Sequence, residues 1–361
     1  MNPVFSLIRE HLQRYRLPQL PKAVLAPVQW LEGSELENGS LQITLGLGFP
    51  FASQRALYES SLQAFLQPLV EQPLAVRLQQ KIQPHVTQQP APTARISNIV
   101  LVSSGKGGVG KSTTAVNLAL ALHREGARVG ILDADIFGPS VPLLLGMDTE
   151  QKPQIADQKY FIPIMAHGLQ ALSMGNVVSA ATPVVFRGPK ASGAVVQMLE
   201  QTQWDDLDYL LVDMPPGTGD IALTVAQKLP VAGAVIVTTP QDVALLDTVK
   251  GIEMFRKANI RVLGIVENMA LHQCSQCGHI EHVFGAGGGE AMAARYAVPL
   301  LGSLPLSLAV RVNAEAGTPV VVSAPQSPEA LAYMAIARAA AAQLSAQPVT
   351  RRAFPPVSTE P

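Results

Sequence analysis

The chain reads Ser104-Gly105-Lys106-Gly107-Gly108-Val109-Gly110-Lys111-Ser112-Thr113-Thr114, and the part from Gly105 to Ser112 matches the pattern G-x-x-x-x-G-K-[ST] in full. A short apolar and β-branched run, 99–103, comes before it, and helix-forming residues with apolar spacing, 115–122, come after it. A glycine-rich turn between a strand and a helix is the setting in which this pattern binds phosphate. The stretch therefore predicts a phosphate-binding loop.

Each residue type in this loop has a chemical task. The glycines let backbone N–H groups turn toward the α and β phosphates, and the N-terminus of the helix that begins near Gly110 adds partial positive charge. Lys111 would neutralise the β and γ oxygens, and Ser112 would offer its hydroxyl to the Mg²⁺ that bridges the same phosphates. A glycine-rich turn without a ligand is the alternative. The loop residues expected to bind ATP are Gly105, Lys106, Gly107, Gly108, Val109, Gly110, Lys111, Ser112 and Thr113.

Lys106 is a second lysine inside the motif. The run Lys106–Thr114, K-G-G-V-G-K-S-T-T, resembles the deviant Walker A of the MinD, ParA and nitrogenase iron-protein class. In that class the equivalent lysine reaches the phosphates of the partner across a nucleotide-sandwich dimer. The resemblance implies a homodimer and a catalytic role for Lys106, and a solvated surface lysine is the alternative.

Composition narrows the class of protein. The chain has 361 residues, of which 48% are hydrophobic and 15% charged, and its formal net charge is −1. This balance gives no reason to expect nucleic acid or an anionic membrane as a partner. The sequence has no apolar run of about 18 residues and no signal-peptide pattern, so we expect a cytoplasmic protein. Two cysteines are too few for a disulfide framework.

The chain divides into four expected parts. Residues 1–86 read as a small α+β domain, 87–97 as a proline- and glutamine-rich linker, 98–346 as the ATPase domain and 347–361 as a disordered tail. In the small domain we expect helices over Phe5–Tyr15 and Ser53–Leu66 and strands over Gly39–Leu47 and Leu74–Leu78.

Strand and helix patterns alternate beyond the linker, which is typical of a mostly parallel, doubly wound sheet with helices on both faces. The fold class is therefore α/β, a P-loop NTPase, with the small α+β domain in front. Near-continuous apolar runs indicate strands that are buried on both faces. The expected strands are Ile99–Ser103, Val129–Ala134, Leu169–Ser173, Tyr209–Asp213, Gly233–Thr238, Arg261–Val266 and Leu300–Leu304, and the last helix is Pro328–Ser345.

Acidic residues that end apolar strands are candidates for the site, because ligands gather at the carboxyl ends of parallel strands. Asp213 has the form of a Walker B carboxylate, which would hold Mg²⁺ through its water shell opposite Ser112. Asp135 is expected to orient or deprotonate the attacking water. Asp133 is an alternative, since the period of two along a strand sends it the same way as Asp135.

Two loops after these strands would sense the γ-phosphate, and their glycines and prolines suit hinges. The stretches 133–140 and 213–220 resemble the D-A-D-I-x-G-P-S and D-x-P-P-G-T-G-D signatures of the Mrp and ApbC branch, which consists of iron–sulfur cluster carrier ATPases. The resemblance covers roughly 98–340. It implies an asparagine that hydrogen-bonds the adenine at Asn268, where a simple turn residue is the alternative. Residues 302–306, with Pro305, would form the other wall of the base pocket.

Cys274 and Cys277 are the only cysteines, in a C-x-x-C spacing that lets both sulfurs face one metal. Zinc bound by these thiols and two of the histidines His272, His279 and His282 is one interpretation, and thiol redox chemistry or an inert pair is another. A 4Fe-4S cluster held by four thiolates from two chains is the third. The preference for iron comes from the family resemblance, because the spacing alone does not choose the metal.

The resemblance thus implies a homodimeric ATPase that carries a labile cluster at its interface and passes it to apo-proteins. A positioning or partitioning ATPase of the MinD and ParA type is the alternative. Such proteins bind membrane or DNA through a basic helix or patch. The expected last helix has Arg338 as its one basic residue, which argues against that alternative.

Overall fold

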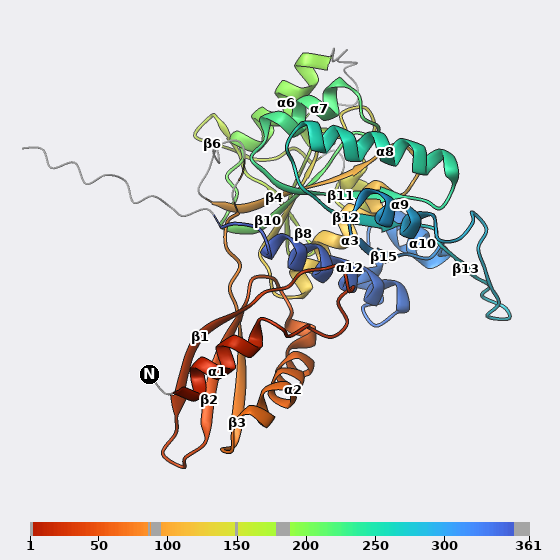
Figure 1. Ribbon diagram of the computed structural model, residues 1–361. Coiled ribbons are helices and arrows are strands. Elements are labelled where there is room, and N and C mark those ends of the chain that lie inside the picture. Colours follow the sequence, from red (N-terminus) through yellow and green to blue (C-terminus); the bar gives the residue numbers. More distant parts are fainter. Residues whose placement is uncertain (1–2, 86, 88–94, 149–150, 178–187, 350–361) are drawn as a thin grey trace, which may run out of the picture.

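Figure 1 shows the computed structural model of the protein, which describes residues 3–85, 87, 95–148, 151–177 and 188–349. The N-terminal part holds a three-stranded sheet in the order β1-β2-β3, in which β1 and β2 are antiparallel and β2 and β3 parallel. Two helices accompany this sheet. The elements are α1 (Pro3–Leu12), β1 (Val28–Glu35), β2 (Leu41–Leu47), the 3₁₀ turn Ala52–Gln54, α2 (Arg55–Leu66), the 3₁₀ turn Gln67–Leu69 and β3 (Leu74–Gln80).

An eight-stranded sheet forms the centre of the larger part, in the order β15-β12-β11-β4-β10-β5-β9-β8. Every neighbouring pair is parallel except β8 and β9 at one edge. The mostly parallel α/β sheet predicted for a P-loop NTPase is confirmed. Its strands are β4 (Ile96–Ser104), β5 (Val129–Asp133), β8 (Ile164–Ala166), β9 (Leu169–Ser173), β10 (Leu207–Asp213), β11 (Val231–Thr238), β12 (Val262–Glu267) and β15 (Leu300–Ser303).

Helices cover both faces of this sheet, because successive side chains of each strand point to opposite faces. Val100 and Val102 of β4 join the apolar cluster under α3 and α12, whereas Ile99 and Leu101 join the cluster under α6, α7 and α8. The helices of the larger part are α3 (Lys111–Arg124), α4 (Val141–Leu144), α5 (Met174–Val177), α6 (Gly188–Glu200), α7 (Asp220–Lys228), α8 (Asp242–Lys257), α9 (Gly288–Tyr296), α10 (Leu308–Glu315), α11 (Val320–Ser323) and α12 (Pro328–Ser345). Two-residue strands complete the part, namely β6 (Ile155–Ala156), β7 (Tyr160–Phe161), β13 (His272–Gln273) and β14 (Ile280–Glu281).

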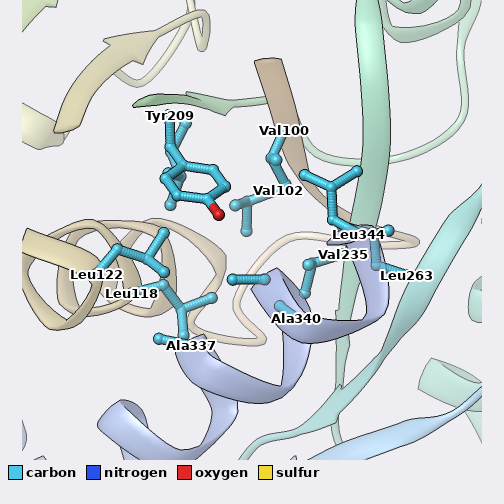
Figure 2. A pocket seen from close by; sticks show the side chains of 12 residues that line it. Val100, Val102, Leu118, Leu122, Tyr209, Val235, Leu263, Ala337, Ala340 and Leu344 are labelled. Carbon is cyan, nitrogen blue, oxygen red and sulfur yellow. The ribbon is translucent and has the colours of Figure 1, made fainter. Parts of the chain in front are cut away.

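A small apolar cavity lies between the sheet, α3 and α12. Figure 2 shows Ala337 and Ala340 of α12 facing it, together with the hydroxyl-bearing end of the Tyr209 ring. Its volume is about 20 Å³. Burial raises the pKa of Tyr209 far above its ordinary value, so this hydroxyl keeps its proton. The cavity is a gap in the core packing rather than a ligand pocket.

A buried ion pair of the larger part bonds to the N-terminal part through Ser53. Glu125 follows the last residue of α3, and its carboxylate pairs with Arg338 of α12, with exposed fractions of 0% and 4%. Ser53 of the N-terminal part donates to this carboxylate through its backbone N–H at 2.9 Å and its hydroxyl at 2.6 Å. Arg338 is therefore a structural residue, and the expected last helix presents no basic side chain to a membrane or to DNA.

Most predicted elements lie within a few residues of the observed ones, and the differences have local causes. Strand β1 was not predicted, because its residues alternate poorly and stay only partly buried at the edge of the sheet. Edge strand β8, which has three residues, was also missed. The predicted helix Phe5–Tyr15 begins and ends earlier, at Pro3 and Leu12, as α1.

The boundaries of the linker, 87–97, and of the tail, 347–361, stay predictions. Ile96 and Asn98 already pair with β10 as part of β4. Val349 forms an antiparallel bridge with His85. Residues 350–361 lie outside the described residues. The division at residue 86 stays a prediction, because one apolar cluster runs across it.

Candidate functional site

The phosphate loop connects β4 to α3 and presents open backbone on one side. Gly108 and Gly110 have φ values of +81° and +80°, a left-handed conformation that glycine adopts without strain. A Cβ atom on Gly107 or Gly108 would meet no atom within 4 Å. A Cβ atom on Gly110 would lie 2.3 Å from Nδ2 of Asn268. The loop is thus tightly packed where it faces the chain and open where phosphate would lie.

Lys111 and Asp213 form the buried centre of the site. The Lys111 Nζ donates to Oδ1 of Asp213 at 2.6 Å and to Oγ of Ser112 at 3.1 Å. Lys111 is 6% exposed and Asp213 is fully buried. Burial raises the pKa of Asp213, and the ammonium of Lys111 opposes that rise. The structure brings these three predicted residues together.

The second carboxylate oxygen of Asp213 provides a test for a metal ion. Asp213 Oδ2 is buried and has no hydrogen-bond partner among the described residues. An unsatisfied buried carboxylate oxygen is costly unless a donor or a cation completes it. Carboxylate and hydroxyl oxygens are the ligand types that Mg²⁺ takes with its waters. The residues present therefore fit a hydrated Mg²⁺ beside Ser112.

Asp133 and Asp135 have different surroundings. The fully buried Asp133 carboxylate accepts hydrogen bonds from the backbone N–H groups of Asp135, Ser140 and Val141, each at 3.1 Å, and from the hydroxyl of Ser173 at 2.9 Å. Burial and the nearby Asp213 carboxylate raise the pKa of Asp133 to about 7. With four donors, Asp133 anchors the loop that follows β5.

Asp135 is the acidic residue of this pair that keeps free acceptor capacity. It is 9% exposed, and its Oδ1 accepts one N–H bond, from Gly138 at 3.3 Å. Its loop contains Phe137, whose side chain is 68% exposed. Of the two carboxylates that the sequence left open, the geometry favours Asp135 for contact with a bound molecule.

A cavity of about 370 Å³ lies beside the phosphate loop. Its lining includes the predicted base-pocket residues Asn268 and Pro305 and the loop residues Gly110 and Thr113. Asn268 donates through Nδ2 to the backbone carbonyl of Val109 at 2.9 Å. In this cavity, the predicted nucleotide-binding residues outside the loop, Asn268 and Pro305, lie next to residues of the phosphate loop.

Lys106 lies apart from the buried pair of Lys111 and Asp213. Its Nζ donates to Oε1 of Gln241 at 3.3 Å, and the residue is half-buried. Gln241 immediately precedes α8, whose first turns expose the apolar side chains of Val243 and Leu246, at 64% and 66%. The structure therefore puts Lys106 beside an exposed apolar surface rather than against the phosphate-facing side chains of its own chain.

Cys274 and Cys277 occupy the turn of a short hairpin that projects from the body of the protein (Figure 1). The hairpin pairs His272 with Glu281 and Gln273 with Ile280. The Cys274 N–H donates to the carbonyl of His279, and the Gly278 N–H to the carbonyl of Cys274, both at 2.9 Å.

Both thiols of this hairpin can be reached from solvent. Cys277 is exposed and Cys274 half-buried. Hydrogen bonds from the backbone N–H groups of Cys277 and Gln276 lower the pKa of Cys274. A thiol with a lowered pKa is a better ligand and nucleophile, because both roles belong to the thiolate.

The histidines near this hairpin do not complete a metal site. Within the described ranges, no three His, Cys, Asp or Glu side chains lie close enough together to hold a metal ion. His282 Nδ1 lies 2.7 Å from the carbonyl of Ala270, and His272 Nδ1 lies 3.2 Å from the carbonyl of Leu306. Among the residues that the structure describes, the two cysteines and two histidines are thus not brought together as a zinc site.

Glu267 is a residue of the site region that the sequence did not single out. Its carboxylate accepts from the Gly289 N–H at 2.6 Å and from the Ser303 hydroxyl at 3.2 Å, and it is 5% exposed. It therefore fixes the start of α9 to the edge of the cavity. Its position at the end of an apolar strand, directly before Asn268, is the signal that could have found it.

None of the helices in the part of the chain that is described has both the length and the apolar character needed to cross a bilayer.

Comparison with known proteins gives a family for the larger part. The ParA family profile described as NUBPL iron-transfer P-loop NTPase matches residues 95–341, which is more than half of the chain. An iron-sulfur cluster carrier protein of Pseudomonas fragi is 61% identical over 257 residues, 71% of this chain and 90% of that protein. An iron-sulfur cluster carrier protein of Haemophilus influenzae is 46% identical over 342 residues, 93% of this chain and 91% of that one.

A solved structure supports the same fold. The nucleotide-binding protein of Archaeoglobus fulgidus in complex with ADP is 35% identical to this chain, with a TM-score of 0.57. The match covers 66% of this chain and 91% of that one. The residues matched by the family profile, 95–341, include the phosphate loop and the residues that line the cavity beside it.

Proposed function

Because the chain belongs to the NUBPL iron-transfer P-loop NTPase family, we propose that it is an iron–sulfur cluster carrier that hydrolyses ATP. It binds a labile 4Fe-4S cluster between two copies of itself and transfers the cluster to apo-proteins. The observation that carries the proposal is the exposed C-x-x-C hairpin six residues beyond Asn268 of the nucleotide cavity. The proposed location is the cytoplasm, because a reducing compartment keeps such thiols free.

Counting ligands supports the homodimer. One chain offers two thiolates, and a four-iron cluster normally takes four. A two-fold axis beside the hairpin would supply the second pair from the same residues of a second chain. Cys274 and Cys277 are accessible enough to meet such a partner. The cluster is the cargo of the protein in this proposal, and the apo-proteins that receive it are its clients.

The residues of the phosphate loop have separate tasks in ATP hydrolysis. Lys111 would exchange its bond to Asp213 for bonds to the β and γ phosphate oxygens, where charge accumulates in phosphoryl transfer. Ser112 and, through water, Asp213 would hold Mg²⁺, which neutralises phosphate charge when it is bound. The backbone from Gly105 to Thr113 cradles the phosphates, and Asn268 and Pro305 enclose the base.

Asp135 and Lys106 complete the proposed catalytic set. Asp135 orients or deprotonates the attacking water, because it keeps acceptor capacity that Asp133 has already used. Lys106 reaches the nucleotide of the second chain. The exposed apolar side chains of Val243 and Leu246 next to Gln241 are suited to that contact, since burying apolar surface favours association.

Anaerobic reconstitution tests the cluster and the dimer together. Purified protein is incubated with ferrous iron and sulfide, and iron, sulfide and oligomeric state are measured after removal of excess reagents. We expect about four irons per dimer. Either Cys274→Ala or Cys277→Ala should abolish the cluster and the cluster-dependent dimer, while ATP still binds the monomer.

His279→Ala is the matched control, because His279 lies beside the same cysteines and is exposed. This variant should keep the cluster. A monomer that holds one zinc, with a metal content that falls as steeply in His279→Ala and His282→Ala as in the cysteine variants, would contradict the proposal.

A further inference from the structure

The base of the cysteine hairpin is hydrogen-bonded directly to the wall of the nucleotide cavity. Leu306 lines the cavity, and its N–H donates to the carbonyl of Leu271 at 2.7 Å. The carbonyl of Leu306 lies 3.2 Å from Nδ1 of His272, the first residue of β13. One residue of the cavity wall therefore holds the hairpin by its N–H and by its carbonyl.

The returning strand of the hairpin is fastened to the same segment. His282 Nδ1 lies 2.7 Å from the carbonyl of Ala270, and the Ala270 N–H donates to the carbonyl of Leu304 at 3.0 Å. A carbonyl oxygen only accepts, so Nδ1 of both His272 and His282 must carry the proton. The two histidines act as donors to backbone at either side of the hairpin base.

Asn268 and Met269, the residues before Ala270 that line the cavity, are also constrained. Asn268 joins the phosphate loop through Val109 and joins β11 through its backbone N–H, which donates to Thr238 at 2.7 Å. Met269 follows with a φ of +58°, a left-handed conformation that is strained for a residue with a side chain. Such strain is held where the surroundings fix the backbone.

We propose that His272 and His282 are positioning residues that link the nucleotide cavity to the cysteine hairpin, so that nucleotide binding changes the reactivity of the two thiols. The inference rests on the proposed function, since it assigns a means by which nucleotide regulates the thiol site. A molecule that enters the cavity contacts Asn268, Met269, Pro305 and Leu306. Any shift of these residues moves the acceptors that hold both strands of the hairpin.

The link works in both directions by thermodynamic necessity. If nucleotide changes the state of the hairpin, then fixing the hairpin must change nucleotide affinity by the same factor. Couplings of this kind are usually about 5-fold or more. Removing the donor at position 282 should weaken the coupling without removing a contact to nucleotide, because His282 does not line the cavity, while His272 and Leu271 still bond to Leu306.

Thiol alkylation of the cluster-free protein tests the inference. The two cysteines are the only ones in the chain, so the rate of reaction with iodoacetamide reports on the hairpin alone. The rate is measured under anaerobic conditions with and without Mg·ADP. We expect nucleotide to change it about 5-fold or more in the unaltered protein. In His282→Ala the ratio should fall clearly toward one, while ADP affinity stays within about 3-fold of the original.

Conservative and matched variants separate positioning from simple damage. His282→Asn puts an amide N–H near the place of Nδ1 and should restore the nucleotide effect, whereas His282→Gln puts it near Nε2 and should not. His279→Ala should behave like the unaltered protein. If His282→Ala folds poorly, the comparison of His282→Asn with His282→Gln decides the question.

Two results would overturn the inference. One is a nucleotide effect on alkylation that is undiminished in His282→Ala and His282→Gln. The other is an unaltered protein whose thiols do not respond to nucleotide. Neither result touches cluster binding, which is measured separately by reconstitution, so the failure of this link and the failure of the carrier function remain distinguishable.

Discussion

The phosphate loop and the cysteine hairpin differ in how much of each site one chain supplies. Around the loop, Lys111, Asp133 and Asp213 are buried and bonded to residues from several elements. In the hairpin, two strands of two residues each flank a turn that holds one exposed and one half-buried cysteine. The first site is assembled by folding of one chain, and in the proposed function the second is completed by a second chain. Mutations should therefore act within the chain at the loop and through assembly at the hairpin.

The largest effect should come from Lys111→Ala. Removing a preorganised charge from a transferring group lowers turnover by about 10²- to 10³-fold. The change also leaves the Asp213 carboxylate buried without its cation, so the protein itself should be destabilised. Steady-state phosphate release gives turnover, and denaturant unfolding gives stability.

The double variant Lys111→Ala, Asp213→Asn is the control for stability. It should recover part of the lost unfolding free energy and none of the turnover. Cys277→Ala should leave both quantities unchanged in the cluster-free protein. If Cys277→Ala lost nucleotide binding to an extent comparable with Lys111→Ala, the two sites would not be independent of each other.

The next largest effect should come from the buried ion pair between Glu125, at the C-terminal end of α3, and Arg338 of α12. Arg338→Ala leaves Glu125 as a buried charge without its partner and should lower the unfolding free energy by about 3 kcal/mol. Denaturant unfolding measures the loss. Arg338→Met with Glu125→Gln removes both charges and should be closer to the unaltered protein. Equal losses in the single and double variants would contradict the role given to this ion pair.

For Asp133 we predict a smaller effect on the free energy of unfolding, and this effect depends on pH. Its pKa in the folded protein, about 7, lies above the ordinary value of 3.8, so folding favours the protonated form. Its contribution to stability is full below about pH 4 and is lost as the pH rises to about 7, with a slope of about 1 kcal/mol per pH unit. Unfolding of the nucleotide-free protein at pH 5, 6, 7 and 8 should show this slope from pH 5 to about pH 7 and a levelling off above it. Asp133→Asn should lack it, whatever its absolute stability, and parallel curves would refute the assignment.

The smallest effect should come from the hairpin surface. Ile280 and Val283 are 52% and 53% exposed, so the double change to serine should alter the unfolding free energy of the monomer by less than about 0.5 kcal/mol. Ile265→Ser, in a fully buried strand position, is the matched contrast and should be severely destabilising. A large loss of stability in the hairpin variant would mean that the hairpin supports the fold of its own chain.

The sequence predicted the fold around the loop well because the signals for it are local. The motif from Gly105 to Ser112 fixes a strand, a turn and a helix together, and Asp213 ends an apolar run that could only be a buried strand. The parallel sheet then follows from the alternation of strand and helix patterns. These features depend on neighbours in the chain, and the pattern shows them directly.

Features that depend on distant contacts were beyond the sequence. The pairing of Glu125 with Arg338 joins residues more than two hundred positions apart, and nothing in either neighbourhood indicates it. Asp133 and Asp135 look equivalent in the sequence, and only the four donors around Asp133 distinguish them. In the sequence, the histidines near Cys274 are candidates for zinc ligands. In the structure, His272 and His282 bond to backbone carbonyls instead.

The contact between the N-terminal part and α12 has a consequence for biosynthesis. Chains leave the ribosome from the N-terminus and tend to fold in that order. Here the N-terminal part emerges first, yet Arg338 and Gln343, which bond to Ser53 and to the backbone N–H of Leu25, are made near the end. Until α12 is released, Glu125 has no cation to pair with. The bonds of Leu25 and Ser53 to α12 can therefore form only after the last helix has been synthesised, and a chain stalled on the ribosome before residue 338 would join its two parts through the bonds of Ser53 to Glu125 without them.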